Sequence, residues 1–402
     1  MSLIGRLIDK LLAKGSITLK LPGKAPRTHG GGGGKHLTVR FTDRMVGFDI
    51  LRNPRLGFGE AYMDGRLVIE DGTILDLMEM IVGANRWEEM GEGRRALRKG
   101  KLTRTLKRLL LPNDVKRARK NVAHHYDIGN DLYELFLDDD LQYSCAYFTD
   151  TANSLERAQL EKKAHIAAKL ALEPGQRVLD IGCGWGGMAL FLHKVAGVDV
   201  LGVTLSEEQL KVARHRAAEA GVSDHVRFEL IDYRLVEEQF DRIVSVGMFE
   251  HVGKPQYPKF FAAIARLLDT KGIALLHAIG RMRGPGLTSA WIRRYIFPGG
   301  YIPALSDVAP VVERSGLWLT DLEVLHLHYA ETLRHWRQRF LANRASLADL
   351  YDDRFCRMWE FYLAASETSF RHGGFMVFQA QLSHALDAAP LTRDYMTDAD
   401  RN

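Results

Sequence analysis

A strand that runs directly into a glycine-rich turn constrains the fold of this chain most strongly. The stretch VLDIGCGWGG, Val178 to Gly187, joins four strand-like residues to a turn that holds four glycines in six positions. Glycine permits a tight strand-to-helix turn and a close approach of a ligand to the backbone. Further apolar, strand-like stretches follow at VDVLGVTLS, VRFELIDY, FDRIVSVGMFEHV and IALLHAIG, with helical stretches between them. Strands that alternate with helices predict an α/β fold with a parallel, doubly wound sheet.

The bulk composition is that of a globular protein. The chain has 402 residues, of which 46% are apolar and 26% charged, and this length allows two domains. No apolar run approaches the length of a bilayer crossing, and charged residues interrupt any secretory signal at the N-terminus. The three cysteines have no zinc-site spacing and are too few for a disulfide framework, so we expect a reducing, cytosolic compartment and no metal site.

The first 90 residues predict a small α+β domain. Residues 3–14 place six aliphatic side chains on one helical face, which either lies in a membrane interface or docks on its own domain. Five glycines in a row from Gly30 predict a flexible loop over residues 22–35. After it, HLTVRFTD predicts a strand, GEAYMDGRLVIEDG a turn and a strand, and TILDLMEMIVGAN an amphipathic helix.

Positive charge is concentrated in the segment that follows. Residues 86–120 hold 13 Lys and Arg against four Asp and Glu, a net charge of +9 in a chain whose total is +5. Such a segment suits an anionic partner, either nucleic acid or anionic lipid headgroups. The aromatic interleaving of a single-strand RNA site is absent, so we expect no nucleic-acid partner. We predict a lipid- or membrane-associated domain over residues 1–90, a basic helical linker over 91–120 and a catalytic domain over 121–402.

The glycine turn favours one class of nucleotide ligand. GxGxxG at Gly182, Gly184 and Gly187 is by itself a weak sign of a dinucleotide site. An NAD site needs an acidic residue about 20 residues later, but the second strand ends on the uncharged Thr204. Asp180 stands directly before the turn, and the pattern DxGxGxG resembles motif I of the class I S-adenosylmethionine (SAM) methyltransferases.

Further motifs occur in a fixed order along the chain: NVAHHYDIGNDLYELFL, LQYSCAYF, VTLSEEQ, IDYR, SVGMFEHVG and LLHAIG. Together they resemble the cyclopropane-fatty-acid synthases, a family that includes the mycolic acid cyclopropane synthases and methyltransferases. The resemblance extends over about Asn121 to Ser383. GEAYMDGRLVIEDG is also similar to the extra N-terminal domain of the bacterial cyclopropane-fatty-acyl-phospholipid synthases, which favours the phospholipid-acting branch.

The resemblance implies an enzyme that transfers a methylene group from SAM to the cis double bond of an unsaturated phospholipid acyl chain and so forms a cyclopropane fatty acid. Attack of the alkene on the methyl group leaves a carbocation, and a base must then remove a proton before the ring closes. Bound bicarbonate is the implied base, in a site protected from water. One alternative is C-methylation of the same alkene, which gives a methyl-branched or methylene product. A second is a non-catalytic protein of this fold that binds membrane or RNA through residues 86–120.

Carried over from the family, the bicarbonate site comprises Cys145, Glu250, His277, Ile279 and Tyr329. Glu250 holds a proton and shares it with bicarbonate, and His277 donates a hydrogen bond. Cys145 and Ile279 contribute backbone donors and shape. Tyr329 offers its hydroxyl to the anion and its π face to the cation. The aromatic residues around Cys145 are interpreted as the wall of a dry pocket with the thiol as a filler, and simple packing is the alternative.

The same resemblance implies a set of SAM contacts: Tyr143, Ser144, Asp180, Gly182, Cys183, Gly184, Thr204, Leu205, Ser206, Gln209, Tyr233 and Arg234. In this set Thr204 and Gln209 replace the usual ribose carboxylate with neutral hydrogen-bonding groups. Arg234 departs from the family, which often has an acidic residue at that position.

Other expectations concern structural residues, partners and location. We expect His124, His125 and His251 to be structural or to support the residues that contact the ligand, since no metal-site spacing includes them. The aromatic stretch SAWIRRYIFPGGYIPAL either covers an acyl-chain tunnel or is ordinary core. The expected partner is an unsaturated phospholipid in an anionic membrane, and the expected assembly is a homodimer. The expected location is cytoplasmic and peripheral, on the inner face of the cell membrane.

Overall fold

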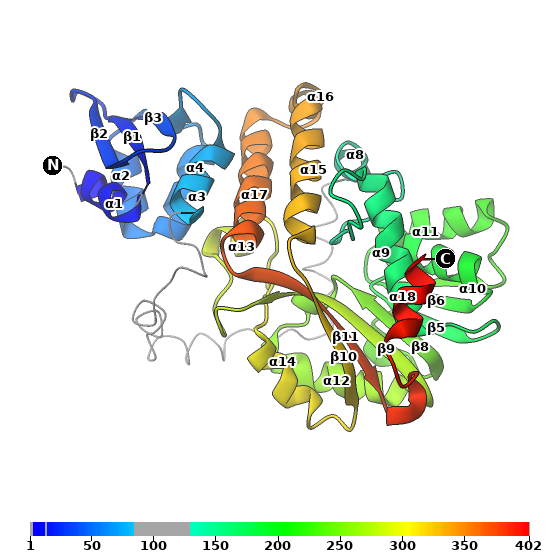
Figure 1. Ribbon diagram of the computed structural model, residues 1–402. Helices are drawn as coiled ribbons and strands as arrows, with labels where there is room; N and C mark the ends of the chain where they lie inside the picture. Colours follow the sequence, from blue (N-terminus) through cyan, green and yellow to red (C-terminus); the bar gives the residue numbers. More distant parts are fainter. Residues whose placement is uncertain (1–2, 13, 84–128, 402) are drawn as a thin grey trace. The chain divides into compact units, whose positions relative to one another are not determined.

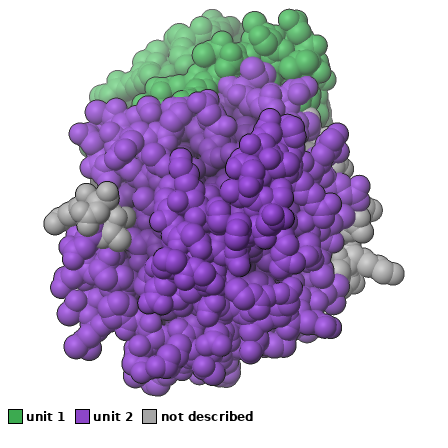
Figure 2. All heavy atoms as spheres, turned by 90° about the vertical axis from the view of Figure 1, so that its right-hand side faces the viewer, with its two compact units in different colours: residues 1–99, 288–298, 330–375 green, residues 100–287, 299–329, 376–402 purple. Residues whose placement is uncertain are grey.

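The structure, a computed structural model, describes residues 3–12, 14–83 and 129–401 (Figure 1). The chain divides into two compact units, which Figure 2 shows in different colours. The first comprises residues 1–99, 288–298 and 330–375, and the second residues 100–287, 299–329 and 376–402. Two segments from the C-terminal half therefore complete the N-terminal unit. The predicted domain limits at residues 90 and 120 stay predictions. The predicted linker and the whole basic segment, residues 86–120, lie outside the described residues.

The first unit combines a four-stranded sheet with helices (Figure 1). The strand order is β2-β1-β3-β4, in which β1 and β3 are parallel and the other neighbours antiparallel. The strands are β1 (Gly15–Lys20), β2 (Arg27–Gly32), β3 (His36–Phe41) and β4 (Leu67–Ile69). The helices are α1 (Leu3–Leu11), α2 (Met45–Arg52), α3 (Pro54–Met63), α4 (Ile74–Gly83), α13 (Ala290–Tyr295), α16 (Arg344–Leu350), α17 (Asp353–Arg371) and nearly all of α15 (His328–Ala342).

The N-terminal amphipathic helix docks on its own unit. The carboxylate of Asp9 on α1 accepts a hydrogen bond of 3.0 Å from the Gly30 N–H and lies 3.2 Å from His29 Nδ1, and both partners belong to β2. A Cβ atom at Gly5 would lie 2.3 Å from His29 Cε1, so this glycine allows the close approach of helix and strand. Of the two positions expected for this helix, docking on its own domain is the one observed, and Leu3 is left exposed.

One prediction based on glycine was wrong. The glycine run was expected to be a flexible loop, but it contributes to β2, which pairs with β1. A Cβ at Gly30 would lie 2.6 Å from the carbonyl oxygen of Gly15, so glycine permits this strand contact. The turn and strand predicted within GEAYMDGRLVIEDG are observed at residues 64 and 65 and in β4, although the stretch begins inside α3. Gly59 lies in that helix, where a Cβ would lie 2.6 Å from Trp291 Cδ1, so this glycine serves a close packing contact.

Trp291 is part of the core of the first unit. Its indole N–H donates to Met63 Sδ at 3.1 Å, and its ring packs edge-on against Phe361 with centroids 4.6 Å apart. It is 1% exposed. Of the two expectations for the aromatic stretch, Trp291 therefore fits ordinary core packing.

The second unit is built on a seven-stranded sheet of order β10-β11-β9-β8-β5-β6-β7 (Figure 1). Its strands are β5 (Arg177–Ile181), β6 (Asp199–Thr204), β7 (Val226–Leu230), β8 (Phe240–Val246), β9 (Leu268–Arg281), β10 (Trp318–Leu325) and β11 (Phe375–Ser383). The strands β5 to β9 are parallel to one another, which confirms the predicted doubly wound sheet. The sequence did not predict β10 and β11, which pair antiparallel at one edge.

Helices cover both faces of this sheet. They are α8 (Asn130–Glu134), α9 (Leu155–Leu170), α10 (Gly187–Ala196), α11 (Glu207–Glu219), α12 (Tyr257–Leu267), α14 (Leu305–Val312) and α18 (Asp394–Arg401). One apolar cluster joins α9, α10 and α11 to the sheet, and a second joins α12 and α14 to the opposite face. Consecutive residues of β5 divide between the two clusters, Val178 to one and Leu179 to the other, as strand geometry requires. Within the described residues, no helix is long and apolar enough to cross a bilayer.

Candidate functional site

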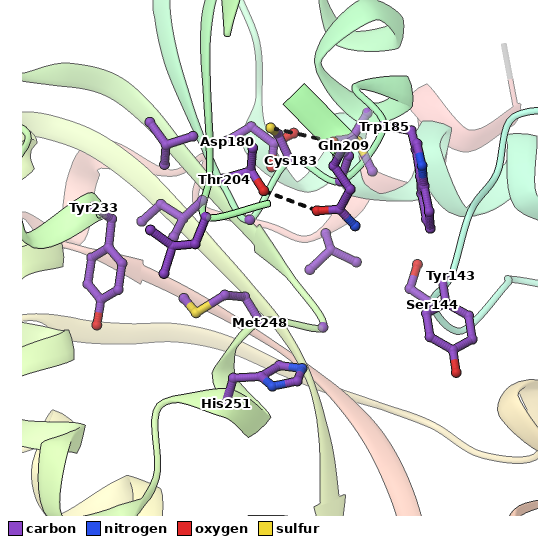
Figure 3. A pocket seen from close by; sticks show the side chains of 18 of the residues that line it. Tyr143, Ser144, Asp180, Cys183, Trp185, Thr204, Gln209, Tyr233, Met248 and His251 are labelled. Carbon is purple, nitrogen blue, oxygen red and sulfur yellow. Dashed lines mark hydrogen bonds between the residues drawn. The ribbon is translucent and has the colours of Figure 1, made fainter. Parts of the chain in front are cut away.

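A cavity of about 160 Å³ opens where the parallel strands of the second unit end (Figure 3). Its walls come from the residues that follow β5, β6, β7 and β8, together with residues 141–144. The carboxyl ends of parallel strands meet at one edge of a sheet, and this edge is where doubly wound folds hold their ligands. Eleven of the twelve predicted SAM contacts line the cavity, and Ser206 is the exception. Their contact with a cofactor remains a prediction.

The glycine turn after β5 forms one wall. Gly182 has a φ of 83°, a conformation that favours glycine, and a Cβ there would lie 2.9 Å from Met248 Cβ. The N–H groups of Gly182 and Cys183 donate to the carbonyl oxygen of Val203, at 2.9 and 3.1 Å, and so join the turn to β6. At the start of α10, a Cβ at Gly187 would lie 2.5 Å from Gln142 Nε2. The turn therefore stays narrow and leaves backbone atoms facing the cavity.

Asp180 brings a buried carboxylate to the edge of the cavity. It is the penultimate residue of β5 and is only 2% exposed. Its Oδ2 atom has no hydrogen-bond partner among the described residues. Burial raises the pKa of Asp180 to about 7, and the charge of Lys162 opposes this rise. An unpartnered, buried carboxylate oxygen at a cavity wall is expected where a polar ligand completes the site.

The end of β6 and the start of α11 hold two polar groups together. Thr204 Oγ1 donates to Gln209 Oε1 at 3.0 Å, the contact drawn as a dashed line in Figure 3. Ser206 caps α11, because its hydroxyl accepts from the Gln209 N–H at 3.3 Å. Ser206 does not line the cavity but positions Gln209, which does.

Arg234 is tied to an acidic neighbour. Its guanidinium donates to both carboxylate oxygens of Asp232, at 2.8 and 2.6 Å, and Asp232 also lines the cavity. An acidic group therefore lies at this wall two residues before Arg234, with its charge balanced by Arg234. Asp232 was not predicted as a site residue, although it belongs to the IDYR motif.

Sequence reasoning also missed several other cavity residues: Gln142, Trp185, Met248, His251 and Gln256. In Figure 3, Trp185 lies on the same side of the pocket as Tyr143 and Ser144, while Met248 and His251 lie away from these three residues. His251 was expected to be structural or to support the residues that contact the ligand, but it lines the cavity itself, and burial lowers its pKa to about 4. His124 and His125 lie outside the described residues.

Lys162 lies directly behind the wall formed by residues 142–144. It is on α9 and is 0% exposed. Its ammonium donates to Gln142 Oε1 at 2.5 Å and to Ser144 Oγ at 2.9 Å. Burial lowers the pKa of Lys162 to about 8, and the carboxylate of Asp138 opposes this effect. The sequence gives no clear signal for this role, because the helical neighbours of Lys162 include the polar Gln159 and His165.

Glu250 lies in a short 3₁₀ turn after β8 and is buried. The N–H of Ile279 donates to its Oε1 atom at 2.5 Å, so two predicted catalytic residues are in direct contact. The Oε2 atom of Glu250 has no partner among the described residues. Burial raises the pKa of Glu250 to about 7, although the Ile279 hydrogen bond favours the ionised form. Glu250 can therefore hold a proton near neutral pH.

His277 lies two residues before Ile279 on β9 and is 2% exposed. Its Nδ1 atom is 3.1 Å from Gln379 Nε2, and an amide nitrogen is a donor, so Nδ1 accepts and Nε2 carries the proton. Burial lowers the pKa of His277 well below its usual value, which keeps the ring neutral. The carbonyl of His277 accepts from the N–H of Gly247, a cavity residue, at 2.9 Å.

Cys145 and Tyr329 come from two segments that contact each other. The N–H of Phe148, in the stretch that contains Cys145, donates to Nδ1 of His328 at 2.9 Å, and Tyr329 is the next residue. The ring of His328 also stacks on Tyr147, with centroids 4.7 Å apart. Cys145 and Tyr329 are both buried, and Ser144, the neighbour of Cys145, lines the cavity.

Comparisons with known proteins agree with this architecture. Residues 113–380 match the family model described as mycolic acid cyclopropane synthetase. The chain is 40% identical, over 339 residues, to the cyclopropane-fatty-acyl-phospholipid synthase of Escherichia coli strain K12, and the match covers 84% of this chain and 85% of the relative. It is 38% identical over 347 residues to the tuberculostearic acid methyltransferase UfaA1 of Mycobacterium tuberculosis, with coverages of 82% and 78%.

Solved structures show the same fold. The mycolic acid cyclopropane synthase CmaA1, in a crystal structure complexed with SAH and CTAB, superposes with a TM-score of 0.63 at 34% identity. The match covers 66% of this chain and 97% of that protein. The second unit therefore has the class I SAM-methyltransferase fold. With a family match over most of its length and two long relatives, the chain is an enzyme that belongs to the mycolic acid cyclopropane synthetase family.

Proposed function

We propose that this enzyme transfers a methylene group from SAM to the cis double bond of an unsaturated phospholipid acyl chain, with bound bicarbonate as the proton acceptor. The observation that carries the proposal is a buried polar cluster directly beside the cavity. Gly247 lines the cavity and donates to the carbonyl of His277, while His251 lines it and is the neighbour of Glu250. A cofactor cavity and a proton-handling group are thus built into adjoining parts of one sheet edge.

The cavity residues fit SAM. Thr204, Gln209 and Asp180 offer neutral and acidic hydrogen-bonding groups, and Met248 and Tyr233 offer apolar surface for a base. The glycine turn leaves room for a ligand against the backbone, since a Cβ at Gly184 would meet no atom within 4 Å. SAM would supply an electrophilic methyl group on a sulfonium. The protein's part is to hold it and to keep water away from it.

The polar cluster fits a small anion. The Oε2 atom of Glu250, the Oε1 atom of Gln379 and the hydroxyl of Tyr257 are all buried without a partner among the described residues. Bicarbonate has both a donor and acceptors, so it could satisfy such a mixed set. A protonated Glu250 and a neutral His277 with its proton on Nε2 would each donate to the anion. An ionised Glu250 would repel the anion, which is why its raised pKa matters.

The proposal of an acyl-chain substrate is supported by the names of the relatives. One is named for cyclopropane formation on phospholipids and another for a fatty-acid methyltransferase reaction. The second name keeps C-methylation without ring closure as the other candidate function. The candidates differ in what happens after methyl transfer. Loss of a proton from the carbocation gives either the cyclopropane or the methylene product, whereas the methyl-branched product needs hydride from a reductant. The buried cluster around Glu250 therefore favours the two products of proton loss over the methyl-branched product.

The test is the mass spectrometry of lipids from cells that express this chain and lack other cyclopropane-forming enzymes. Monounsaturated phospholipids should gain one CH₂, and the product should resist catalytic hydrogenation under conditions that saturate alkenes. A product that is reduced as an alkene would identify the methylene alternative. A product that already carries two hydrogens more would identify the methyl-branched alternative.

A further inference from the structure

An exposed apolar stripe runs along α2 of the first unit. Met45, Phe48 and Leu51 are 53%, 55% and 39% exposed, whereas Val46 and Ile50 on the opposite side of the helix are buried. At about 100° per residue the three exposed side chains fall within about 120° of the helix circumference. Large apolar side chains that gather on one exposed face usually mark a binding surface.

Arginines lie on the same face of α2. Arg44 precedes the helix, Arg52 ends it and Arg55 follows shortly after, and all three are exposed. By the same helical geometry, Arg44 and Arg52 fall within the sector that holds the apolar stripe. No ion pair among the described residues engages these three guanidinium groups.

The nearby acids do not balance this charge. Asp43 and Asp49 both bind Arg66, at 2.8 and 3.0 Å. The hydrogen bonds from Arg66 hold the pKa of Asp43 at about 2, so this carboxylate is ionised at neutral pH. Four arginines, Arg66 included, against these two aspartates leave a net charge of +2. The face of α2 is therefore apolar with a net positive rim, the chemistry of a helix that lies in the interface of an anionic bilayer.

We propose that the α2 face formed by Met45, Phe48 and Leu51, with Arg44, Arg52 and Arg55 around it, docks the enzyme on an anionic phospholipid bilayer. The proposal rests on the proposed function, because a phospholipid acyl chain is reached only at a membrane. It also assigns the docking role to a helix other than α1, for which the sequence left a membrane-interface position and docking on its own domain open. Asp9 of α1 binds β2 and Ile4 of α1 is buried, so α1 is held within the unit, whereas the apolar side chains of α2 are exposed.

Vesicle flotation of the full chain is the first test. Wild-type protein should float with phosphatidylglycerol vesicles, and the double variant Met45→Ser, Phe48→Ser should bind about tenfold or more weakly, because interfacial burial of two large side chains is lost. The variant Leu350→Ser is a matched control, since Leu350 is 55% exposed on α16 of the same unit, and it should float as the wild type does. Replacing Arg44, Arg52 and Arg55 by Gln should weaken binding to anionic vesicles by about fivefold for each arginine and change binding to neutral vesicles little.

A labelling experiment keeps the proposal testable if the double variant folds poorly. The three native cysteines are buried, so a dye placed on Phe48→Cys marks this position selectively. An environment-sensitive dye there should shift to the blue when phosphatidylglycerol vesicles are added, and the same dye on Leu350→Cys should not. Equal shifts at both positions, or unchanged flotation of the double variant, would overturn the proposal.

Two further outcomes separate this inference from others. If the double variant converts a dimer to a monomer in light scattering and still floats normally, the α2 face is an interface between copies of this chain and the proposal is wrong. Methylation of phospholipid dispersed in detergent tests the proposed function without a bilayer. Wild-type protein that floats through α2 but leaves dispersed lipid unmodified would refute the function and leave the docking surface standing.

Discussion

Glu250 is a buried carboxyl group that is proposed to exchange a proton during the reaction. Replacing it with Gln keeps its size and the acceptor for the Ile279 N–H but removes the ionisable group. We expect turnover to fall by about 100-fold or more, as for loss of a positioned acid–base group, while SAH affinity measured by calorimetry changes little. Near-normal turnover of Glu250→Gln would remove this residue from the mechanism.

The same substitution has a predictable effect on stability. The pKa of Glu250 is about 7 in the folded protein and 4.5 in a free side chain. A raised pKa means that the folded state holds the proton more tightly, so stability falls as pH rises from about 4.5 to about 7 and then levels off. The Gln variant lacks this loss and should be more stable than wild type at about pH 8, by about 2–3 kcal/mol at most. Denaturant unfolding at about pH 5 and pH 8 measures the difference; equal pH dependence in both proteins would show that Glu250 ionises normally.

Lys162 is expected to act on the cofactor cavity through Gln142 and Ser144. The variant Lys162→Met loses both hydrogen bonds, so residues 142–144 should lose their fixed position. We expect the KM for SAM to rise by about tenfold with a much smaller change in kcat, since the lysine supports binding more than the chemical step. Lys169→Met is the matched control, because this lysine is also buried on α9 but pairs with Glu323, which is not a cavity residue. A fall in kcat alone, or the same effect in both variants, would contradict the prediction.

Residues that follow a strand directly could be found from the sequence. Gly182, Gly184 and Thr204 could be placed because a motif and a strand end fix their position along the chain. Lys162 and His251 could not, because each reaches the cavity region through tertiary packing that no local pattern records. Asp232 was not predicted because the motif was matched at Tyr233 and Arg234. The ion pair between Arg234 and Asp232 places both side chains at the cavity wall.

At the scale of elements, the cap of α11 offers a matched pair of mutations. Ser206→Ala and Ser154→Ala each remove a serine that caps a helix of the second unit, α11 and α9 respectively. Both should lower the free energy of unfolding by about 1 kcal/mol. Only Ser206→Ala should also weaken SAH binding several-fold, because the first turn of α11 carries Gln209 into the cavity. Calorimetric titration with SAH checks this, and equal affinity in the two variants would show that the cap does not position Gln209.

The pattern of strands and helices predicted the parallel sheet well but failed where glycine or edge strands were involved. Five buried parallel strands have near-continuous apolar sequences, which are easily recognised. β10 is only partly buried and mixes polar with apolar residues, so its sequence does not stand out from loops. Gly30 was expected in a flexible loop, although a Cβ there would lie 2.6 Å from the carbonyl oxygen of Gly15, and no local pattern predicted that Gly59 would lie against the indole ring of Trp291. Such contacts depend on partners that are distant in sequence.

For the whole molecule, the decisive question is how a protein reaches a lipid substrate when no described helix can cross a bilayer. The sequence places a net charge of +9 in residues 86–120, all of which lie outside the described residues. The α2 face of the first unit adds apolar area with three exposed arginines. We expect the charge to select anionic membranes and the apolar area to prolong contact after binding.

Charge reversal separates the two contributions. Changing Arg94, Arg95, Arg98 and Lys99 to Glu should abolish activity on vesicles and spare SAH binding, since each basic residue near an anionic surface contributes about 1 kcal/mol. Reversing four exposed basic residues of the second unit, Lys194, Lys211, Lys271 and Arg314, changes the net charge equally and serves as the control. Wild-type binding to phosphatidylglycerol vesicles should weaken steeply with salt, because screening acts over about 8–10 Å. Flotation with vesicles of graded charge measures both effects. Binding that does not change with lipid charge or salt would contradict the electrostatic model and leave apolar insertion through α2 as the means of attachment.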